Sequence, residues 1–229
     1  MPREMLDRHI RRLLDELLIL GSMVENSTLG AVQALKERNM EAAKQYYKDD
    51  QLINKKRFEI ENTTIATLAT QQPIMAGDLR MLASILDVTT EIERMGDYAK
   101  GIAKICLMLE NDPLIKPLID IPRMAEIATD MLHRALGAFV GGDVETAHEI
   151  PLEDDQVDHL YNQVYRELAT LILQDPRNID QANVLLWAAH NLERLADRVT
   201  NICERTIYVY TGQLMEIKAS DDELLDPSD

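Results

Sequence analysis

The two halves of the chain repeat one another, and this duplication limits the fold more than any other sequence feature. Three pairs of segments match in the same order, at offsets that fall from 104 to 103 to 100 residues. The pairs are residues 39–54 with 143–158, 65–73 with 168–176, and IERMGD at 92–97 with LERLAD at 192–197. Offsets that shrink by a few residues at loops are typical of a duplicated unit. The sequence therefore predicts two similar domains in tandem.

Apolar residues recur at helical spacing in both halves, as in Ile10, Leu13, Leu14 and Leu17. Aromatic residues make up only 4% of the chain, which favours helices over a β-sandwich. We expect an all-α fold of six long helices, arranged as two tandem three-helix bundles that pack together. The predicted helices are residues 6–37, 39–72, 78–110, 122–141, 143–174 and 178–210.

Turn and capping residues set the expected boundaries. Asn39, Asp78 and Asp143 are suitable N-cap residues, and Pro73 and Gly77 interrupt the chain between the second and third helices. The interpretation divides the chain into a first repeat (1–110), a proline-containing linker (111–121), a second repeat (122–213) and an acidic tail (214–229) that we expect to be disordered. In the third helix, Leu79, Leu82, Leu86, Ile92, Ala99, Ile102 and Cys106 are expected to face inward.

The charge and the cysteines narrow the class of protein. Forty acidic and 24 basic residues give a formal net charge of −16, which argues against binding nucleic acid through its phosphates. It also disfavours adsorption to anionic lipid. No apolar run approaches the length of a membrane span, and the charged N-terminus is no signal peptide. Cys106 and Cys203 both fall in apolar stripes, so we expect core thiols in a reducing cytoplasm.

Pairs of acidic residues four positions apart are the candidate site. Glu93 with Asp97, and Glu193 with Asp197, place two carboxylates on one helix face, about 6 Å apart along the axis. The middle helix of the second repeat adds Asp154 and Asp158, where the first repeat has Asp50 and Asn54. If neighbouring helices bring these groups together, a bound cation would relieve their repulsion. Oxygen ligands without cysteine indicate iron, manganese, magnesium or calcium.

Two simpler explanations compete with a metal site. An acidic pair on a helix is usually a solvated face, and Arg94 and Arg194 can pair with the acids in salt bridges. Glu93 lies about 100° from the inward direction that Ile92 and Ala99 mark, so the site is expected at the bundle surface or edge.

A ferritin-type di-iron enzyme is the rival with a buried metal centre. That class needs two Glu-x-x-His motifs, whereas this chain has only Glu145 with His148, and the first repeat has Glu41 with Lys44. There is no phosphate-binding glycine loop, nucleophile elbow or zinc spacing. We therefore predict that the protein is not an enzyme.

The order of these motifs resembles the PhoU family. The resemblance covers about residues 5–212 and rests on ERMGD and LERLAD with the segments that follow them, on QQPIMAGDLRMLASIL, and on DDQLIN and DDQVD. It implies two similar three-helix bundles in a cytoplasmic homodimer that regulates phosphate uptake. It also implies a negative regulator of the phosphate-starvation response that connects a phosphate ABC transporter ATPase to a sensor histidine kinase.

The resemblance also implies metal clusters, with iron as the first expectation and manganese, magnesium and zinc left open. Carried over by position, one site contains Glu93, Asp97 and Asp50, and the other contains Glu193, Asp197, Asp154 and Asp158. Asn54 stands where the second repeat has the acidic residue Asp158, which predicts a weaker first site. Pro151 predicts a kink just before Asp154. The alternative from another class is a metal-free helical module whose acids contact a basic partner.

Overall fold

A computed structural model describes residues 2–109 and 113–217, and these residues form helices and no strand. Six long helices dominate, as the sequence predicts. Their bounds are α1 Pro2–Glu37, α2 Met40–Thr70, α3 Ala76–Met108, α4 Asp120–Gly141, α6 Asp154–Gln174 and α7 Ile179–Thr211. Short elements complete the described chain: α5 Val144–Glu149, the 3-10 turn η1 Ile150–Glu153 and the 3-10 turn η2 Pro176–Asn178.

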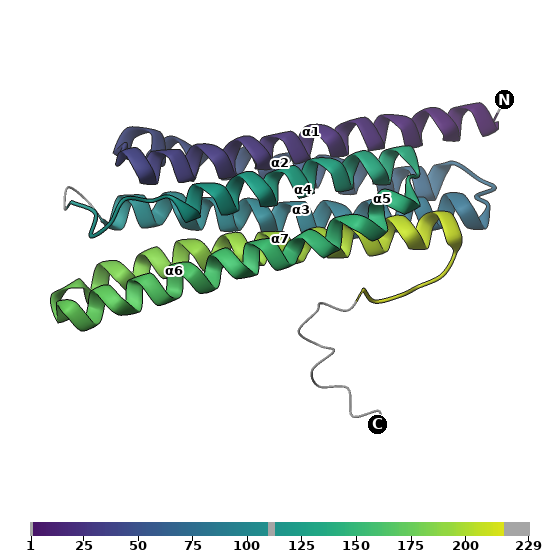
Figure 1. Cartoon of the computed structure of the whole chain (residues 1–229). Helices are drawn as coiled ribbons and strands as arrows, with labels where there is room; N and C mark the ends of the chain where they lie inside the picture. Colours follow the sequence, from purple (N-terminus) through teal and green to yellow (C-terminus); the bar gives the residue numbers. More distant parts are fainter. Residues whose placement is uncertain (1, 110–112, 218–229) are drawn as a thin grey trace, which may run out of the picture.

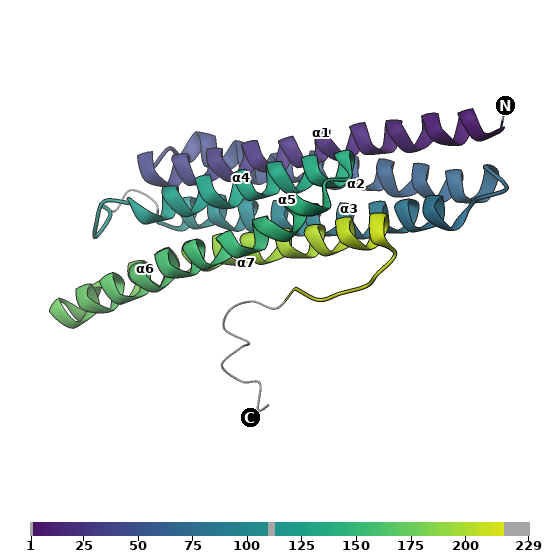
Figure 2. The same ribbon diagram turned by 45° about the vertical axis from the view of Figure 1, so that its right-hand side comes forward.

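The long helices lie roughly parallel or antiparallel in one elongated bundle (Figures 1 and 2). Helices α1, α2 and α3 form the first unit, and α4, α6 and α7 form the second. The units meet where α3 packs against α7 and α1 against α4, while α2 packs mainly against α1 and α3, and α6 mainly against α7 and α4. At Gly21 of α1, a Cβ atom would collide with the Leu136 side chain, so glycine permits this close approach. One continuous apolar core spans both units.

The burial pattern confirms the duplication residue by residue. Five buried positions of α3 have buried equivalents on α7, 100 residues later. Leu82, Ile85, Val88, Ile92 and Met95 correspond to Ala182, Leu185, Ala188, Leu192 and Leu195. On α2, a constant offset of 104 residues pairs the buried positions 43, 50, 53, 60 and 64 with 147, 154, 157, 164 and 168 on α5 and α6. These two offsets define equivalent positions in the rest of the molecule.

Two of the three predicted N-caps are confirmed. The Asn39 side chain accepts a hydrogen bond from the Ala42 amide at 3.0 Å, and the Asp143 side chain accepts one from the Thr146 amide at 3.0 Å. The third, Asp78, is wrong because α3 begins at Ala76 and its N-cap residue is Met75. Asp78 instead lies buried in the first turn and accepts a hydrogen bond from Arg3.

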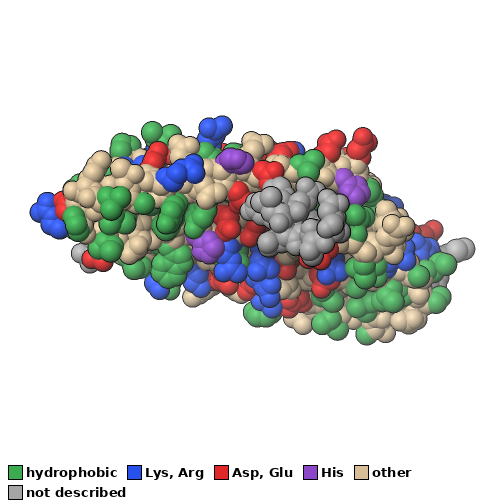
Figure 3. All heavy atoms as spheres, turned by 60° about the horizontal axis from the view of Figure 1, so that its bottom comes forward, with side chains coloured by type: hydrophobic (Ala, Val, Ile, Leu, Met, Phe, Trp, Pro, Cys, Tyr) green, Lys and Arg blue, Asp and Glu red, His purple; other side chains and the backbone are tan. Residues whose placement is uncertain are grey.

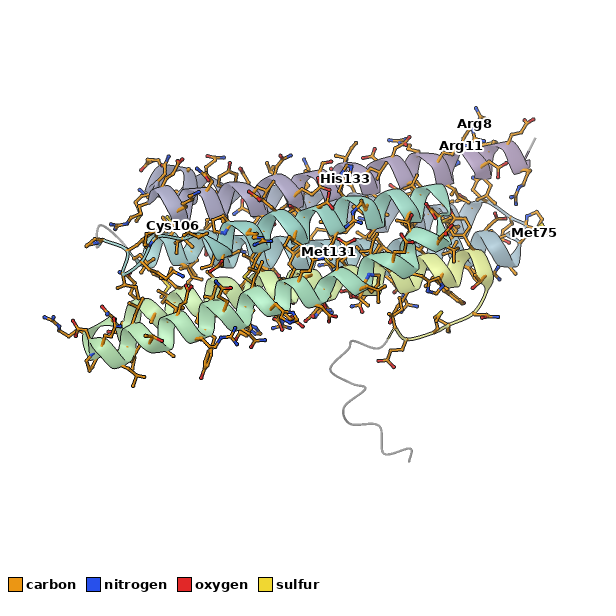
Figure 4. The ribbon with its side chains drawn as sticks, in the orientation of Figure 1. Arg8, Arg11, Met75, Cys106, Met131 and His133 are labelled. Carbon is orange, nitrogen blue, oxygen red and sulfur yellow. The ribbon has the colours of Figure 1, made fainter. Side chains whose placement is uncertain are left out.

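Further differences occur near helix ends. The predicted fifth helix is broken, because η1 interrupts it at Pro151, which confirms the expected kink. Leu79 is 52% exposed, so its predicted inward orientation in the first turn of α3 is wrong. Helix α4 begins at Asp120, two residues before the expected start at Pro122. Cys106 and Cys203 are both buried, as predicted (Figure 4 labels Cys106).

The last described residues follow α7 without regular structure. Gly212 ends α7 in the left-handed conformation, with a φ of 77°. We predicted disorder for residues 214–229. Of these, residues 218–229 lie outside the described residues. None of the helices in the described ranges combines the length and apolar character that a membrane span requires.

Candidate functional site

The second repeat places four acids where α6 begins beside the middle of α7. Asp154 and Asp158 lie in the first turns of α6, and Glu193 and Asp197 lie on the facing part of α7. Figure 3 shows acidic side chains gathered near the centre of the face that α6 and α7 form. The 3-10 turn η1 ends at Glu153, directly before Asp154. Arg134 of α4 donates to Glu153 at 2.8 Å and so ties the start of α6 to α4. We call these four residues the second cluster.

Asp154 is the most constrained member of the second cluster. Asp154 is only 8% exposed, and its Oδ1 atom has no hydrogen-bond partner. Burial, together with the charges of Asp197, Asp158 and Glu193, raises the pKa of Asp154 from 3.8 to about 7. A buried carboxylate that lacks a donor is costly, so Asp154 holds its proton near neutral pH or needs a positive partner.

Glu193 is in a similar position. Burial, and then the charges of Asp197 and Asp158, raises the pKa of Glu193 from 4.5 to about 7. His190 Nδ1 lies 3.0 Å from Glu193 Oε2, but that oxygen has no partner in hydrogen-bonding geometry. Burial also raises the pKa of Asp197, against the opposing effect of nearby arginines. In the described part of the chain, no ion pair joins a lysine or arginine to Asp154, Glu193 or Asp197.

The first repeat places Asp50 of α2 beside Glu93 and Asp97 of α3, and we call these three residues the first cluster. Two cations lie within this cluster. Lys100 Nζ is 2.7 Å from Asp50 Oδ2, and Arg57 Nη1 is 2.8 Å from Glu93 Oε1.

Asp50 is also held by an amide. Asn54 donates to Asp50 Oδ2 at 3.2 Å, so one Asp50 oxygen is well satisfied although the residue is only 4% exposed. Its other oxygen, Oδ1, has no partner. Burial, and then the charge of Asp50, raises the pKa of Asp97, while Lys100 opposes that effect.

The two cations are replaced at the equivalent positions of the second cluster. At the offset of 100, Lys100 corresponds to Thr200, and at the offset of 104, Arg57 corresponds to Tyr161. Burial, and then the charge of Glu193, raises the pKa of Tyr161. Tyr161 is therefore close to Glu193, just as Arg57 is close to Glu93. We did not identify Lys100 and Arg57 from the sequence, although aligning the repeats position by position would have exposed both differences.

Arginine side chains of α7 contact α3 across the interface of the two repeats. Arg198 donates to Glu91 Oε2 at 2.9 Å and to the Tyr98 hydroxyl at 3.3 Å. The Arg194 guanidinium lies 5.2 Å from the centre of the Tyr98 ring. Arg194 and Arg198 therefore contact the first repeat. Arg94, which the sequence analysis considered as a partner of the acid pair, lies 3.7 Å from Glu91.

The arrangement fits a cation in the second cluster better than in the first. An oxygen-only donor set with two buried, unbonded oxygens suits a hard cation. In the first cluster, Lys100 and Arg57 pair with Asp50 and Glu93, and one buried oxygen, Asp50 Oδ1, is unbonded. As the side chains stand, no three His, Cys, Asp or Glu groups within the described residues converge closely enough to hold a metal ion. The predicted edge position is right for Asp97 and Asp197, which are exposed, and wrong for Asp50 and Asp154, which are buried.

The fold and the clusters together define an all-helical protein made of two tandem three-helix domains, each with an acidic motif on its last helix. A family model described as the PhoU domain matches twice, over residues 17–106 and 121–206. The chain therefore belongs to the PhoU family. The two matches coincide with the two repeats, which confirms both the resemblance and the duplication.

Relatives of similar length carry one name. The chain is 34% identical over 217 residues to the phosphate-specific transport system accessory protein PhoU homolog of Clostridium acetobutylicum, covering 95% of this chain and 99% of the relative. It is 35% identical over 202 residues to the protein of that name from Aquifex aeolicus, covering 88% and 91%. These names describe the relatives as accessory proteins of phosphate transport.

Solved structures show the same fold. The phosphate transport system regulatory protein PhoU from Streptococcus pneumoniae matches with a TM-score of 0.85 and 31% identity, over 93% of this chain and 100% of that one. PhoU from Pseudomonas aeruginosa matches with a TM-score of 0.84 and 31% identity, over 90% and 99%. The arrangement of helices described above is thus the arrangement of PhoU proteins.

Proposed function

We propose that the protein is a cytoplasmic accessory and regulatory protein of phosphate transport, and that it binds a divalent or trivalent cation at the second cluster. The regulatory role is supported by its membership of the PhoU family and by the names of its relatives. The cation is supported by one observation above all: Asp154 is buried among three other acids with an oxygen that nothing satisfies.

The residues that would hold the cation are Asp154, Asp158, Glu193 and Asp197. A bound ion would supply the positive charge that Lys100 and Arg57 supply in the first repeat. We further propose a homodimer that negatively regulates the phosphate-starvation response as an adaptor between a phosphate ABC transporter ATPase and a sensor histidine kinase. In this role the cation is structural or sensory, and the protein carries out no turnover.

The chain offers its own probe for the metal part of this proposal. Trp187, the single tryptophan, is 54% exposed and lies on α7 six residues before Glu193, about 9 Å along the helix. Titration with manganese or ferrous iron should quench its fluorescence and raise the melting temperature, and elemental analysis should find retained metal. Unchanged melting with every cation, together with no retained metal, would contradict the metal part.

The regulatory part needs a separate test. Deletion of the gene should release phosphate uptake from its normal control, and copurification should recover the transporter ATPase and the kinase with the protein. Normal control of uptake in the deletion strain would contradict the regulatory role, whatever the outcome of the metal experiments.

A metal-free interaction module is the second candidate, favoured by large apolar side chains that are exposed on α6 and α7. Trp187 of α7 and Tyr165 and Leu173 of α6 are large and exposed, and Leu173 is 85% exposed. Reversing the charges at Glu193 and Asp197 distinguishes the two candidates. Partner binding that persists in chelator and is lost on charge reversal would favour the module over the metal model.

A further inference from the structure

The same place between two helices is open in the first repeat and filled in the second. The offset of 104 residues also relates α1 to α4, because the buried positions 17, 20, 24, 31 and 35 of α1 match the buried positions 121, 124, 128, 135 and 139 of α4. Glu16 is therefore equivalent to Asp120, the first residue of α4. Before Glu16, α1 continues as a helix, whereas a linker without helical structure precedes Asp120. Figure 1 shows these two segments at opposite ends of the bundle.

In the second repeat, the linker lies across the groove between α4 and α6. Lys116 pairs with Glu167 of α6, and its Nζ atom lies 4.0 Å from Asp120 Oδ2 of α4. Gln181 of α7 donates to the Pro113 carbonyl at 3.0 Å and so holds the start of the linker. Only about 10 Å³ of space remains between the linker and the helices α4, α6 and α7. The chain therefore fills this groove with its own lysine.

In the first repeat, a cavity of about 370 Å³ lies between α1 and α2, and we call it the first groove. Two buried apolar side chains line it, Leu13 of α1 and Ile60 of α2. Its charged lining residues are Arg12, Glu16 and Glu59. The volume lies within the range of about 300–1,000 Å³ that is typical of ligand pockets.

Equivalent residues line both grooves. At the offset of 104, Glu16 and Ile60 correspond to Asp120 and Val164, which line the filled groove. One residue of each pair belongs to the first helix of its repeat and the other to the middle helix. The two grooves therefore occupy the same place in the duplicated fold.

Arg12 is the counterpart of Lys116 but does not fill its groove. Arg12 Nε lies 4.0 Å from Glu16, just as Lys116 Nζ lies 4.0 Å from Asp120. Lys116 also reaches Glu167 of the neighbouring helix, whereas Arg12 forms no ion pair with α2 in the described part of the chain. The Arg12 side chain is 75% exposed, and the Lys116 side chain is 16% exposed. The contact that closes the second groove is thus missing from the first.

Glu59 is the acid of the first groove that has no cationic partner. Glu16 already pairs with Lys56 of α2. Among residues 2–109 and 113–217, no side chain forms an ion pair or a hydrogen bond with the Glu59 carboxylate. In the second repeat, the acid of the middle helix, Glu167, has Lys116 as its partner. The first groove therefore lacks the lysine that its counterpart contains.

We propose that the first groove binds a lysine side chain from an extended segment of a partner protein, with apolar residues on both sides of that lysine. The linker supplies the chemistry of this occupant, because Ile115 and Leu118 flank Lys116 and pack into the core. The ammonium group of the partner's lysine pairs with Glu59, and its alkyl stem lies on the apolar wall that includes Ile60. This inference depends neither on the cation site nor on the regulatory role proposed above.

The probe is a capped peptide with the sequence of residues 113–119, Pro-Leu-Ile-Lys-Pro-Leu-Ile. We expect the full protein to bind it in isothermal titration calorimetry, and Glu59→Gln to weaken binding about fivefold through the loss of one partly exposed ion pair. A peptide with norleucine in place of lysine should bind the natural chain about fivefold more weakly and should not distinguish it from Glu59→Gln. Glu41→Gln, at the other end of α2, is the matched control and should bind the lysine peptide normally.

Arg12 is the competing occupant of the first groove. If Arg12 turned onto Glu59, the natural chain would not bind the peptide and Arg12→Gln would bind it, and this result would overturn the proposal. If the groove is open to a partner, Arg12→Gln should bind the peptide at least as tightly as the natural chain, because a like charge has been removed.

Three other results would also overturn the proposal. The first is that neither the natural chain nor Arg12→Gln binds the peptide. The second is equal binding by Glu59→Gln and the natural chain, which would place the peptide elsewhere on the molecule. The third is that N-acetyl-lysine amide binds as tightly as the peptide, which would make the groove a site for a free amine. Equal melting temperatures of the variants and the natural chain check that each protein is folded.

Discussion

The two acidic clusters share one backbone scaffold and differ in how their charge is balanced. In the first, Lys100 and Arg57 lie 2.7 and 2.8 Å from Asp50 and Glu93. In the second, the equivalent residues are Thr200 and Tyr161, and the pKa values of Asp154 and Glu193 rise to about 7. The two repeats thus contain two copies of one acidic motif, and only the first copy has lysine and arginine side chains paired with its acids within the described residues.

The largest expected effect comes from giving the second cluster the cation of the first. In Thr200→Lys, the new ammonium group should occupy the place of the metal, so manganese should no longer stabilise the protein. If the natural chain is measured at about one hundred times its dissociation constant, manganese should raise its melting temperature by about 5–10 °C. Thermal melts with and without manganese measure the difference.

The matched control for this change is Thr200→Gln, which adds similar length without charge and should keep most of the response to manganese. A full manganese response in Thr200→Lys would show that the missing cation does not explain the difference between the clusters. A lost response in both variants would indicate a steric effect at position 200.

The next largest effect should come from removing the cation of the first cluster. Lys100→Met leaves Asp50, only 4% exposed, without its charged partner. Breaking a buried pair costs about 3–5 kcal/mol, and because Lys100 is partly exposed we expect about 2 kcal/mol less stability. Urea unfolding in chelator measures this free energy of unfolding. Thr200→Met, the equivalent change in the second repeat, should cost much less, and equal losses would remove the proposed asymmetry.

The sequence predicted the helices and the positions of the acids, but not their charge balance. Helical periodicity depends on spacing along one chain, and the acid pairs follow from an i, i+4 rule, so both can be inferred locally. Lys100 reaches Asp50 across 50 residues, from α3 to α2, and only the packing of the two helices brings them together. The predicted start of α3 was wrong for a related reason, because Asp78 suits an N-cap by residue type but pairs with Arg3 of α1 instead.

A smaller effect should appear in the pH dependence of stability. Because folding raises the pKa of Asp154 from 3.8 to about 7, the folded state holds a proton that the unfolded state releases between these values. The free energy of unfolding should therefore fall as the pH rises from about 4 to about 7 in metal-free protein. Asp154→Asn should remove about 1.4 kcal/mol of this fall for each pH unit between about 5 and 6.5, given that one pKa unit corresponds to 1.36 kcal/mol.

Glu193, Asp197 and His190 face the same cluster and contribute to the measured slope, so the difference between the natural chain and Asp154→Asn is the relevant quantity. Urea unfolding in chelator at pH 5.5 and 7.5 gives this difference. Asp50→Asn is the equivalent change in the first cluster. A pH dependence that is the same in Asp154→Asn and in the natural chain would contradict the raised pKa of Asp154.

The smallest effect decides whether Asn54 or Lys100 makes the first cluster different. The sequence alone attributed the weaker first site to Asn54, which stands where the second cluster has Asp158. Asn54→Asp adds a like charge four residues from Asp50 and should cost only a few tenths of a kcal/mol. Because Lys100 still neutralises Asp50, this variant should gain no binding of manganese beyond that of the natural chain. Isothermal titration in a chain with Glu193→Gln and Asp197→Asn, which silences the second cluster, measures this. Manganese binding that appears with Asn54→Asp alone would assign the difference to Asn54, whereas binding that appears only when Lys100→Thr is added would assign it to Lys100.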